Sequence, residues 1–340
     1  SSLPLTLSPQ LQEQKSVDAD GMRPLRGLCC CSRRIVTMSS QTFSVTELAS
    51  ACIDLALIAG AKINDIVIKK VDLQVIDKGE VEGDASCVDP TTIADLTAEK
   101  IIAGSLRVAF PGLNVIGEEE IGDVGPEFIK VPNLKLLTKA LGNAGKVPSA
   151  WAGVKKEDIC VYVDPLDGTK EFTEGIHSAV TVLVGFSIKG RPAFGVVLQP
   201  FFDNGSQRCF WGMPGTGAFS CTYTDIAAAT KWERVEGKAN AAESLIVGTT
   251  RSHGRPEIES AIKISKATAV HRVGGAGNKV LLIIEGTIDC YLFPVAGTKR
   301  WDTCAPEAIL ESVGGICTDK NGDTIVYTND RAQVKNSNGV

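Results

Sequence analysis

The segment Val161–Thr169 places two carboxylates, a glycine and a hydroxyl directly after an apolar run. Residues 159–163 are apolar and rich in β-branched side chains, which predicts a short buried strand. Asp164 and Asp167 follow, separated by a proline that we expect to stop the pairing of this strand. Two such acids repel each other unless a cation holds them, and Mg²⁺ prefers oxygen ligands that it shares with phosphate groups. The segment therefore predicts a magnesium site, although a turn with solvated acids would give the same pattern.

The residues after Asp167 predict a place for a phosphate beside this metal site. Gly168 permits a sharp turn, and Thr169-Lys170-Glu171 is typical of the first turn of a helix. The free N–H groups and the positive dipole end of a helix start suit an anion. We expect the Thr169 hydroxyl to lie beside both the metal and the phosphate.

Three further segments place acids at the boundaries of predicted elements. Asp89 is expected in the loop before a helix and near a metal-bound water, Glu118 follows a short apolar strand, and Asp302 is expected at a helix N-cap. Capping, a first-turn acid such as Asp95 and a solvated acidic run explain each segment separately. If they converge, two or more Mg²⁺ ions would supply the shared counter-charge. Two metals about 3.5–4 Å apart can activate a water and stabilise a leaving oxygen.

Two more segments suggest contacts to a substrate. Gly274–Lys279 is a glycine-rich turn before an apolar helix, and it has neither Walker nor full dinucleotide-binding spacing. Its backbone could approach a ligand phosphate with Lys279 as a point charge, or it could be an ordinary tight connection. Thr249–His253 ends a predicted strand with polar donors, which suits a second phosphate or a base.

The elements that must position these residues follow from the hydrophobic pattern. Apolar residues at three- and four-residue steps predict a helix over 44–70, with Ser44 and Glu47 as a capping box. A polar loop over 79–83, a helix over 92–110, a strand over 113–116 and an irregular region over 121–157 follow. The later segments predict antiparallel strands near 179–188, 192–199 and 208–221, and then alternating strands and helices at 244–250, 256–266, 269–273, 276–286, 288–293 and 303–313. This order predicts an α/β fold with a second layer set after residue 243.

Composition narrows the class of protein. The chain has 340 residues and a net charge of −5, which argues against a general binder of nucleic acid or membrane surfaces. It has three His and no apolar run of about 18 residues, so carboxylate chemistry in a protein without a membrane span is expected. The eleven Cys form no C-x-x-C pair, which fits a reducing, cytoplasmic compartment. Residues 1–40 are expected to be a disordered extension, either a targeting segment or leader sequence.

Four motifs together are more specific for one protein family than each is alone. They are D-P-T-T-x-A-D, G-E-E, V-D-P-L-D-G-T and W-D-T-C-A-P-E. In this order they resemble the Mg²⁺-dependent, lithium-sensitive phosphatase superfamily, which includes inositol monophosphatases, inositol polyphosphate 1-phosphatases and 3'(2'),5'-bisphosphate nucleotidases. The resemblance covers roughly 44–340, and the segments around Thr250, Gly275 and Asp302 look most like the bisphosphate nucleotidases. It implies a layered αβαβα sandwich, with domains at 41–243 and 244–340.

The resemblance also implies roles for individual residues. The side chains of Glu118, Asp164, Asp167 and Asp302 and the carbonyl of Leu166 would bind two or three Mg²⁺ ions. Asp89 and Thr169 match the pair that orients or deprotonates the attacking water. Gly168, Thr250, His253, Gly275 and Lys279 match substrate-binding positions.

The implied reaction is hydrolysis of adenosine 3',5'-bisphosphate to AMP and phosphate by a monomer, with the sulfated relative as a second substrate and with lithium inhibition. An inositol polyphosphate 1-phosphatase or inositol monophosphatase is the alternative, and a non-hydrolysing nucleotide sensor ranks below both. Family members continue with a final strand and helix where this sequence ends at residues 336–340, so we expect a fragment with an exposed sheet edge.

Overall fold

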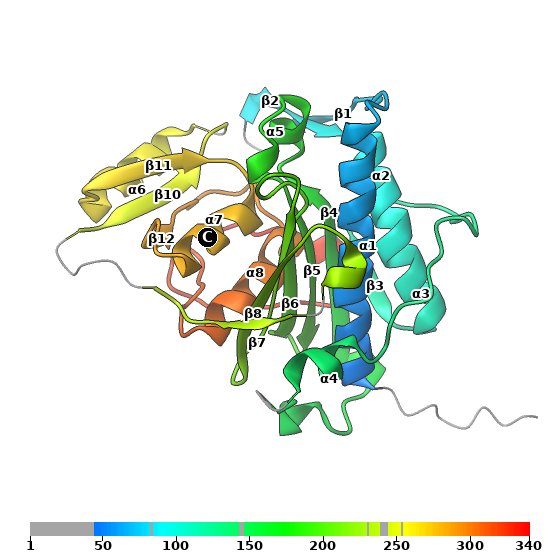
Figure 1. Cartoon of the computed structure of the whole chain (residues 1–340). Helices are drawn as coiled ribbons and strands as arrows, with labels where there is room; N and C mark the ends of the chain where they lie inside the picture. The colour runs from blue at the N-terminus through cyan, green and yellow to red at the C-terminus, as the bar shows by residue number, and fades with distance from the viewer. Residues whose placement is uncertain (1–43, 82–83, 143–145, 230, 239–243, 253) are drawn as a thin grey trace, which may run out of the picture. The chain divides into compact units, whose positions relative to one another are not determined.

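A seven-stranded sheet forms the centre of the fold (Figure 1). The computed structural model describes residues 44–81, 84–142, 146–229, 231–238, 244–252 and 254–340. Strands β3 and β4 are parallel, and every later neighbour in this sheet is antiparallel. In spatial order the strands are β3 (Asn114–Gly117), β4 (Ile159–Asp167), β5 (Thr181–Ile188), β6 (Arg191–Gln199), β7 (Gln207–Met213), β8 (Gly217–Tyr223) and β9 (Glu233–Val235).

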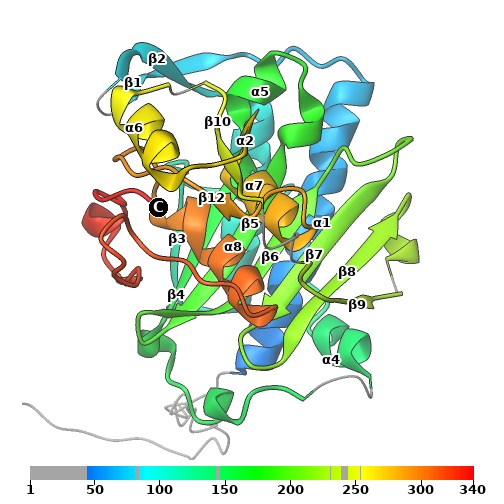
Figure 2. The ribbon, with the colours of Figure 1, turned by 90° about the vertical axis from the view of Figure 1, so that its left-hand side faces the viewer.

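Strands β4 to β6 are buried on both faces, so helices must cover the sheet twice. The helices α1 (Val45–Ile68), α2 (Ile93–Glu99) and α3 (Ser105–Ala109) cover one face. On the other face lie α7 (Ala276–Ile284) and α8 (Arg300–Ser312) (Figures 1 and 2). The predicted helix over 92–110 is confirmed as α2 and α3, joined by a π-helical turn over Lys100–Gly104. Ser44 accepts the Glu47 N–H of α1 at 3.2 Å, as its capping pattern predicts.

A smaller parallel sheet lies beyond α7, which contacts both sheets. Its strands, in spatial order, are β11 (Ala269–Val273), β10 (Ile246–Thr250) and β12 (Cys290–Tyr291), and α6 (Pro256–Ser265) connects β10 to β11. The predicted alternation of strands and helices after residue 243 is therefore confirmed. The whole arrangement is the layered α/β sandwich that the sequence predicts. Residues 43–340 cluster as one compact unit, and a domain boundary at 243/244 stays a prediction.

Helix α8 lies unusually close to the central sheet because two facing strand positions are glycines. A Cβ atom added to Gly185 of β5 would come within 2.6 Å of the Ala305 nitrogen, and one added to Gly195 of β6 would come within 2.1 Å of the Ala305 carbonyl oxygen. Ala305, which both glycines face, lies three residues after Asp302 in α8. The absence of two side chains thus sets how deeply α8, and the acid at its start, sits on the sheet.

Three local predictions are wrong. The loop predicted over 79–83 is part of a hairpin of β1 (Ile76–Val81) and β2 (Asp84–Thr91), so Asp89 lies in a strand rather than in a loop. Among the described strands, this hairpin forms a separate two-stranded sheet, and β2 contacts α5. The strand predicted over 208–221 is two strands, β7 and β8, joined by a turn. Pairing of β4 does not stop at Pro165, because Asp164 pairs with Leu183 and Asp167 pairs with Thr181 across an irregularity that accommodates the proline.

The remaining described elements are short. They are α4 (Leu136–Leu141), α5 (Thr169–Thr173) and 3-10 turns at Ser149–Trp151, Lys156–Asp158, His177–Ala179, Ile226–Ala228 and Arg331–Gln333. Among the described residues no helix is long and apolar enough to cross a membrane. The prediction for residues 1–40 lies outside the described residues.

Candidate active site

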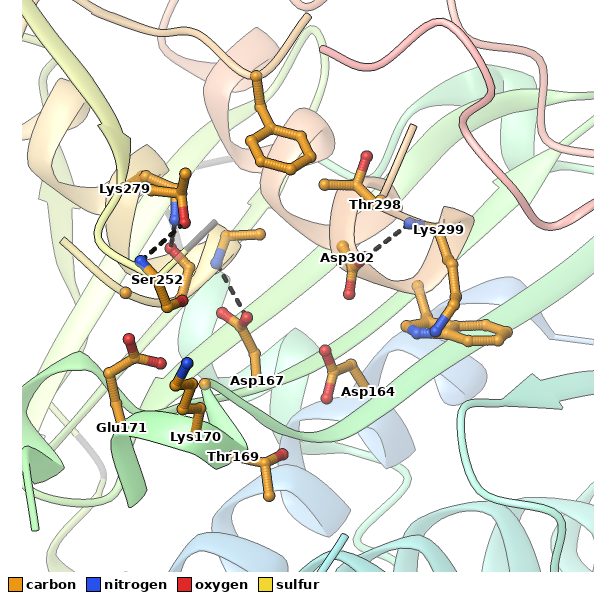
Figure 3. A pocket seen from close by; sticks show the side chains of 18 of the residues that line it. Asp164, Asp167, Thr169, Lys170, Glu171, Ser252, Lys279, Thr298, Lys299 and Asp302 are labelled. Carbon is orange, nitrogen blue, oxygen red and sulfur yellow. Dashed lines mark hydrogen bonds between the residues drawn. The ribbon is translucent and has the colours of Figure 1, made fainter. Parts of the chain in front are cut away.

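A polar cavity of about 320 Å³ lies where β3 and β4 end and where α5, α7 and α8 begin (Figure 3). Segments from seven parts of the chain supply its walls. The predicted site residues among its lining are Glu118, Asp164, Leu166, Asp167, Gly168, Thr169, Thr250, Gly275, Lys279 and Asp302. The structure therefore brings together every predicted metal ligand, although their roles as ligands stay predictions.

Asp164, at the end of β4, is 1% exposed. Burial raises its pKa well above the usual range, and the negative charges of Glu118, Asp167 and Asp302 raise it further. Burial, with the charge of Glu118, also raises the pKa of Asp302 to about 7. The carboxylates of Asp164, Asp167 and Asp302 face one another across the cavity (Figure 3). Their mutual repulsion means that the ionised cluster needs additional positive charge.

Asp302 is not the N-cap of its helix. It is the third residue of α8, and its carboxylate accepts the N–H of the N-cap residue Lys299 at 2.6 Å. A carboxylate at this position complements the unpaired N–H groups of the helix start. The same hydrogen bond holds the side chain at the cavity wall.

The carboxylate of Asp167 is held by backbone groups of α7. It accepts the N–H of Ala276 at 2.9 Å, the N–H of Gly277 at 2.8 Å and the hydroxyl of Thr181 at 2.7 Å. Burial raises its pKa, while the nearby ammonium of Lys279 and these hydrogen bonds oppose that shift. The N–H groups at the start of α7, which the sequence assigned to a ligand phosphate, are thus occupied by Asp167.

Glycine is required at position 275 for this contact. Gly275 has a φ of 73°, and a Cβ there would lie 2.5 Å from the Ala179 carbonyl oxygen and 3.1 Å from Oδ2 of Asp167. A larger residue would force the loop away from Asp167. Gly275 therefore acts on the carboxylate cluster from behind, besides lining the cavity.

Lys279 is 4% exposed, and burial lowers its pKa. Its ammonium donates to the Gly275 carbonyl at 2.6 Å and lies 4.7 Å from the ring centre of Tyr291. The predicted point charge is therefore present at the cavity wall, and it also fixes the Gly275 loop.

Thr169, the first residue of α5, lies beside the acids with its hydroxyl already oriented. The hydroxyl lies 2.9 Å from Oδ1 of Asp95 and 3.0 Å from the Leu166 carbonyl, and both are hydrogen-bond acceptors. Asp95 is 2% exposed, and its Oδ2 accepts the Thr92 N–H at 2.8 Å and the Thr92 hydroxyl. Burial raises the Asp95 pKa to about 7. A buried carboxylate whose pKa is close to neutral pH, and which accepts a hydrogen bond from a hydroxyl at a cavity, is suited to proton transfer.

The structure thus places Asp95 against Thr169. The side chain of Asp89 lies outside the described part of the structure, as does all of His253. The sequence offered a signal for Asp95, because it is the second acid of the D-P-T-T-x-A-D motif and one turn after the N-cap. The sequence pattern by itself indicates only a favourable first-turn acid, and in the structure Asp95 also forms a capping box with Thr92.

Glu118 is joined by a second acid that the sequence analysis did not select. Lys78 of β1 donates to Glu118 at 2.8 Å and to Glu119 at 2.9 Å. Glu119 is 6% exposed and also accepts the Thr91 hydroxyl at 2.9 Å. The hairpin β1–β2 therefore places an ammonium group on the acids that follow β3.

Residues at and after the end of β10 supply another of the predicted substrate contacts in the cavity. Thr250, at the end of β10, is 6% exposed and accepts the N–H of Ser252 at 3.2 Å. Arg251 pairs with Glu171 at 3.2 Å and with Glu174, which ties β10 to α5. Lys170 and Ser252 also line the cavity (Figure 3).

These residues fit Mg²⁺ by the chemistry of their donors. Buried carboxylates and the Leu166 carbonyl offer only oxygen, which hard divalent ions prefer. In the described part of the chain no three acid, histidine or cysteine side chains are already drawn together into a closed metal cluster. The charge of Glu118 adds to burial in raising the pKa of Asp164 and of Asp302, and a bound cation would favour their ionised forms.

The two sheets with helices between them and an acid-lined cavity at the strand ends define a layered α/β sandwich protein. The chain belongs to the inositol monophosphatase family, whose sequence model matches residues 44–339. Enzymes of this family are generally Mg²⁺-dependent. The match includes every predicted site residue of the chain.

The relatives in this family include nucleotide phosphatases. The chain is 36% identical over 311 residues to 3'(2'),5'-bisphosphate nucleotidase 1 of Dictyostelium discoideum, a match that covers 88% of this chain and 94% of the relative. The Homo sapiens protein of the same name is also 36% identical, with 89% and 92% covered. Among solved structures, CysQ from Bacteroides thetaiotaomicron, a bacterial member of the family, superposes with a TM-score of 0.57 at 26% identity, covering 86% of this chain and 95% of CysQ.

Proposed function

We propose that this protein is a Mg²⁺-dependent phosphomonoesterase that removes the 3'-phosphate of adenosine 3',5'-bisphosphate to give AMP and phosphate. The observation that carries the proposal is the Asp95–Thr169 hydrogen bond at the edge of a cavity lined by five further acids. The curated relatives at 36% identity, which are named for this class of substrate, support the choice of nucleotide. 3'-Phosphoadenylyl sulfate is a second substrate to be tested.

Glu118, Asp164, Asp167, Asp302 and the Leu166 carbonyl would hold the metal, and we propose two or three ions. Bound Mg²⁺ would lower the pKa of the attacking water and neutralise negative charge on the departing ribose oxygen. The protein's own contribution is to keep these carboxylates at one edge of the sheet. The Ala276 and Gly277 N–H groups do so for Asp167, and the Lys299 N–H does so for Asp302.

Thr169 and Asp95 would handle the proton. The hydroxyl of Thr169 donates to Asp95, which leaves its oxygen free to accept a hydrogen bond from the attacking water. As the water attacks phosphorus, its proton would pass to the Thr169 oxygen while the Thr169 proton passes to Asp95. Because burial raises the Asp95 pKa to about 7, this carboxylate can accept a proton near neutral pH.

The second, non-reacting phosphate would supply binding energy that positions the first. We assign its contacts to Thr250, Gly275 and Lys279, which line the same cavity. His253 belongs to the same predicted set. Gly168, with a φ of 87°, lets the chain turn from β4 into α5 beside the reacting phosphate.

A substrate panel tests the proposal. Phosphate release should be fast from adenosine 3',5'-bisphosphate with Mg²⁺, slow from AMP and from inositol phosphates, and absent without the metal. Li⁺ should inhibit, as the resemblance implies. Equal turnover of all substrates would contradict the nucleotide preference, and no turnover of any would contradict the enzyme.

Hydrolysis of an inositol phosphate is the alternative, because inositol monophosphatase 3 of Danio rerio is also a relative, at 28% identity over 307 residues. The same panel decides between the two. We also propose that the protein is a monomer. We propose a reducing, cytoplasmic compartment because the seven cysteines whose side chains the structure describes are free thiols.

A further inference from the structure

Arg331 connects two acid-bearing segments of the cavity although it lies outside the cavity itself. Its guanidinium donates to the carbonyl of Gly117 and, at 3.2 Å, to the carbonyl of Glu118. The same group lies 5.7 Å from the ring centre of Trp301, the residue before Asp302. One side chain therefore contacts the end of β3 and the start of α8 at once.

On the β3 side, Arg331 completes the anchoring of Glu118. The Glu118 N–H donates to the Val163 carbonyl of β4 at 3.0 Å, one residue before Asp164. The Glu118 carbonyl accepts from Arg331. With both backbone groups held from opposite sides, the direction in which the Glu118 side chain leaves the backbone is restricted.

On the α8 side, Trp301 is 5% exposed, and two cations lie near its ring. The ammonium of Lys299 is 5.3 Å from its ring centre, and the guanidinium of Arg331 is 5.7 Å away. Distances of this order allow favourable cation–π contact. The neighbouring backbone is fixed too, because the Arg300 N–H donates to the Val334 carbonyl at 2.7 Å.

We propose that Arg331 is a positioning residue that sets the separation of Glu118 and Asp302 and thereby tunes the affinity of the site for Mg²⁺. This inference rests on the proposed function. It concerns the backbone carbonyls behind the acids, and it assigns Arg331 no contact with metal or substrate.

The segment around Arg331 does not need this side chain to stay in place. The Tyr327 N–H donates to the Gly190 carbonyl at 3.0 Å, and the Asn329 amide donates to the Glu157 carbonyl at 2.8 Å. The Asn336 amide donates to the Lys299 carbonyl at 3.0 Å. Removal of the guanidinium should therefore leave the metal-free fold close to wild type.

Geometry and charge make opposite predictions, which makes the proposal testable. A cation near Glu118 and Asp302 repels Mg²⁺, so loss of its charge alone would tighten metal binding. A planar fork that holds two carbonyls and stacks on an indole is lost in both Arg331→Gln and Arg331→Lys, although lysine keeps the charge. We therefore expect both variants to bind Mg²⁺ more weakly.

The experiment titrates Mg²⁺ against wild-type protein and both variants with two readouts. The first is the rise in Tm that the metal alone produces, and the second is the Mg²⁺ concentration that gives half-maximal release of phosphate from adenosine 3',5'-bisphosphate. Both variants should need roughly 10-fold more Mg²⁺, the lower end of the effect of losing an outer partner of a metal ligand. The metal-free Tm and the rate at saturating Mg²⁺ should change little.

Arg234→Gln is the matched control. Arg331 pairs with Glu120 at 3.4 Å, and Arg234 likewise pairs with Glu236 at 3.2 Å. Arg234 also donates to a carbonyl, that of Thr216, at 3.1 Å. It likewise lies over an aromatic ring, that of Phe219 at 5.9 Å, and it is 48% exposed against 41% for Arg331. Because it belongs to β9 and does not line the cavity, its Mg²⁺ titration should match wild type.

Each other outcome overturns the inference. An Arg331→Lys titration equal to wild type would show that charge suffices, and a tighter Arg331→Gln would show that charge dominates. A large loss of metal-free Tm in both variants would make Arg331 a structural residue only. If wild-type protein neither hydrolyses the nucleotide nor responds to Mg²⁺, the proposed function fails instead, which separates the two failures.

Discussion

Carboxylates are buried at two places in this molecule, and the two places differ in the groups that hold them. Behind α8, Arg191 donates to Glu307 at 2.7 Å and to Glu311 at 2.6 Å, and Tyr327 donates its hydroxyl to Glu307. In the cavity, backbone N–H groups hold Asp167 and Asp302, and Lys78 donates to Glu118.

The difference teaches how the two clusters are used. The Arg191 cluster is satisfied by protein groups and joins β6, α8 and the segment around Tyr327, so it is structural. The acids of the cavity come from separate elements and repel one another, so we expect their ionised form to bind cations from solution. Four substitutions test this comparison.

Asp164→Asn should have the largest effect. It removes a metal ligand, so phosphate release should fall by more than the roughly 10–100-fold that loss of an outer partner costs. It also removes a repelling buried charge, so the Tm of the metal-free protein should rise. Activity assays and thermal melts in EDTA measure the two effects. A fall in both would mean that the acids of the cavity are balanced without metal.

Thr169→Val should come next. Valine keeps the shape but removes the hydroxyl that Asp95 holds, so we expect a loss of roughly 100-fold in kcat, the lower range for a group that moves a proton. The rise in Tm produced by Mg²⁺ should persist, because Thr169 is not a proposed ligand. Thr169→Ser, which restores a hydroxyl, is the control. Full activity of the valine variant would remove Thr169 from the mechanism.

Arg191→Met should reduce stability and leave the metal response unchanged. It leaves Glu307 and Glu311 without their cation, but Arg191 is 39% exposed, so the cost should fall below the ~3–5 kcal/mol typical of a broken buried pair. Urea unfolding gives the free energy of unfolding, and a Mg²⁺ titration gives the metal response. A weakened metal response would mean that the two clusters are coupled through α8.

Glu307→Gln should have the smallest effect, visible as a pH dependence. Burial raises the pKa of Glu307 from 4.5 to about 7, so the folded state binds a proton that the unfolded state releases above 4.5. This group therefore makes its full contribution to stability below pH 4.5 and loses it as the pH rises to about 7. The Tm of wild type relative to the variant should fall across that window. A constant difference would contradict the raised pKa.

Local pattern predicted much of this fold. The period of apolar residues located α1, the central antiparallel strands and the later alternation, because each of these elements buries a regular face. The apolar pattern missed the hairpin β1–β2, because a polar, glycine-containing sequence indicated a loop there. It also ended β4 at Pro165, although the pairing of β4 continues past this residue. The gathering of Glu118, Asp164, Asp167 and Asp302 followed from their shared position at the ends of elements.

The supporting contacts could not be predicted, since they join residues far apart in the chain. Nothing near Asp95 indicates that its partner is Thr169, and nothing in Gly274–Gly277 indicates that its N–H groups bind Asp167. Arg331 lies in a polar segment whose sequence predicts only a surface loop. These contacts depend on how side chains from several elements are arranged in space, and this arrangement cannot be inferred from local sequence patterns.

The glycines at 185 and 195 have a consequence for how sequence variation in this enzyme would be understood. A methyl group at either position would lift α8 from the strands beneath it and shift Asp302 with it. A glycine-to-alanine change deep in the sheet, normally counted as mild, would then impair chemistry several residues away. Engineering of this enzyme for bulkier phosphate esters should keep Gly185 and Gly195 and vary cavity-lining residues such as Lys170 and Ser252 instead.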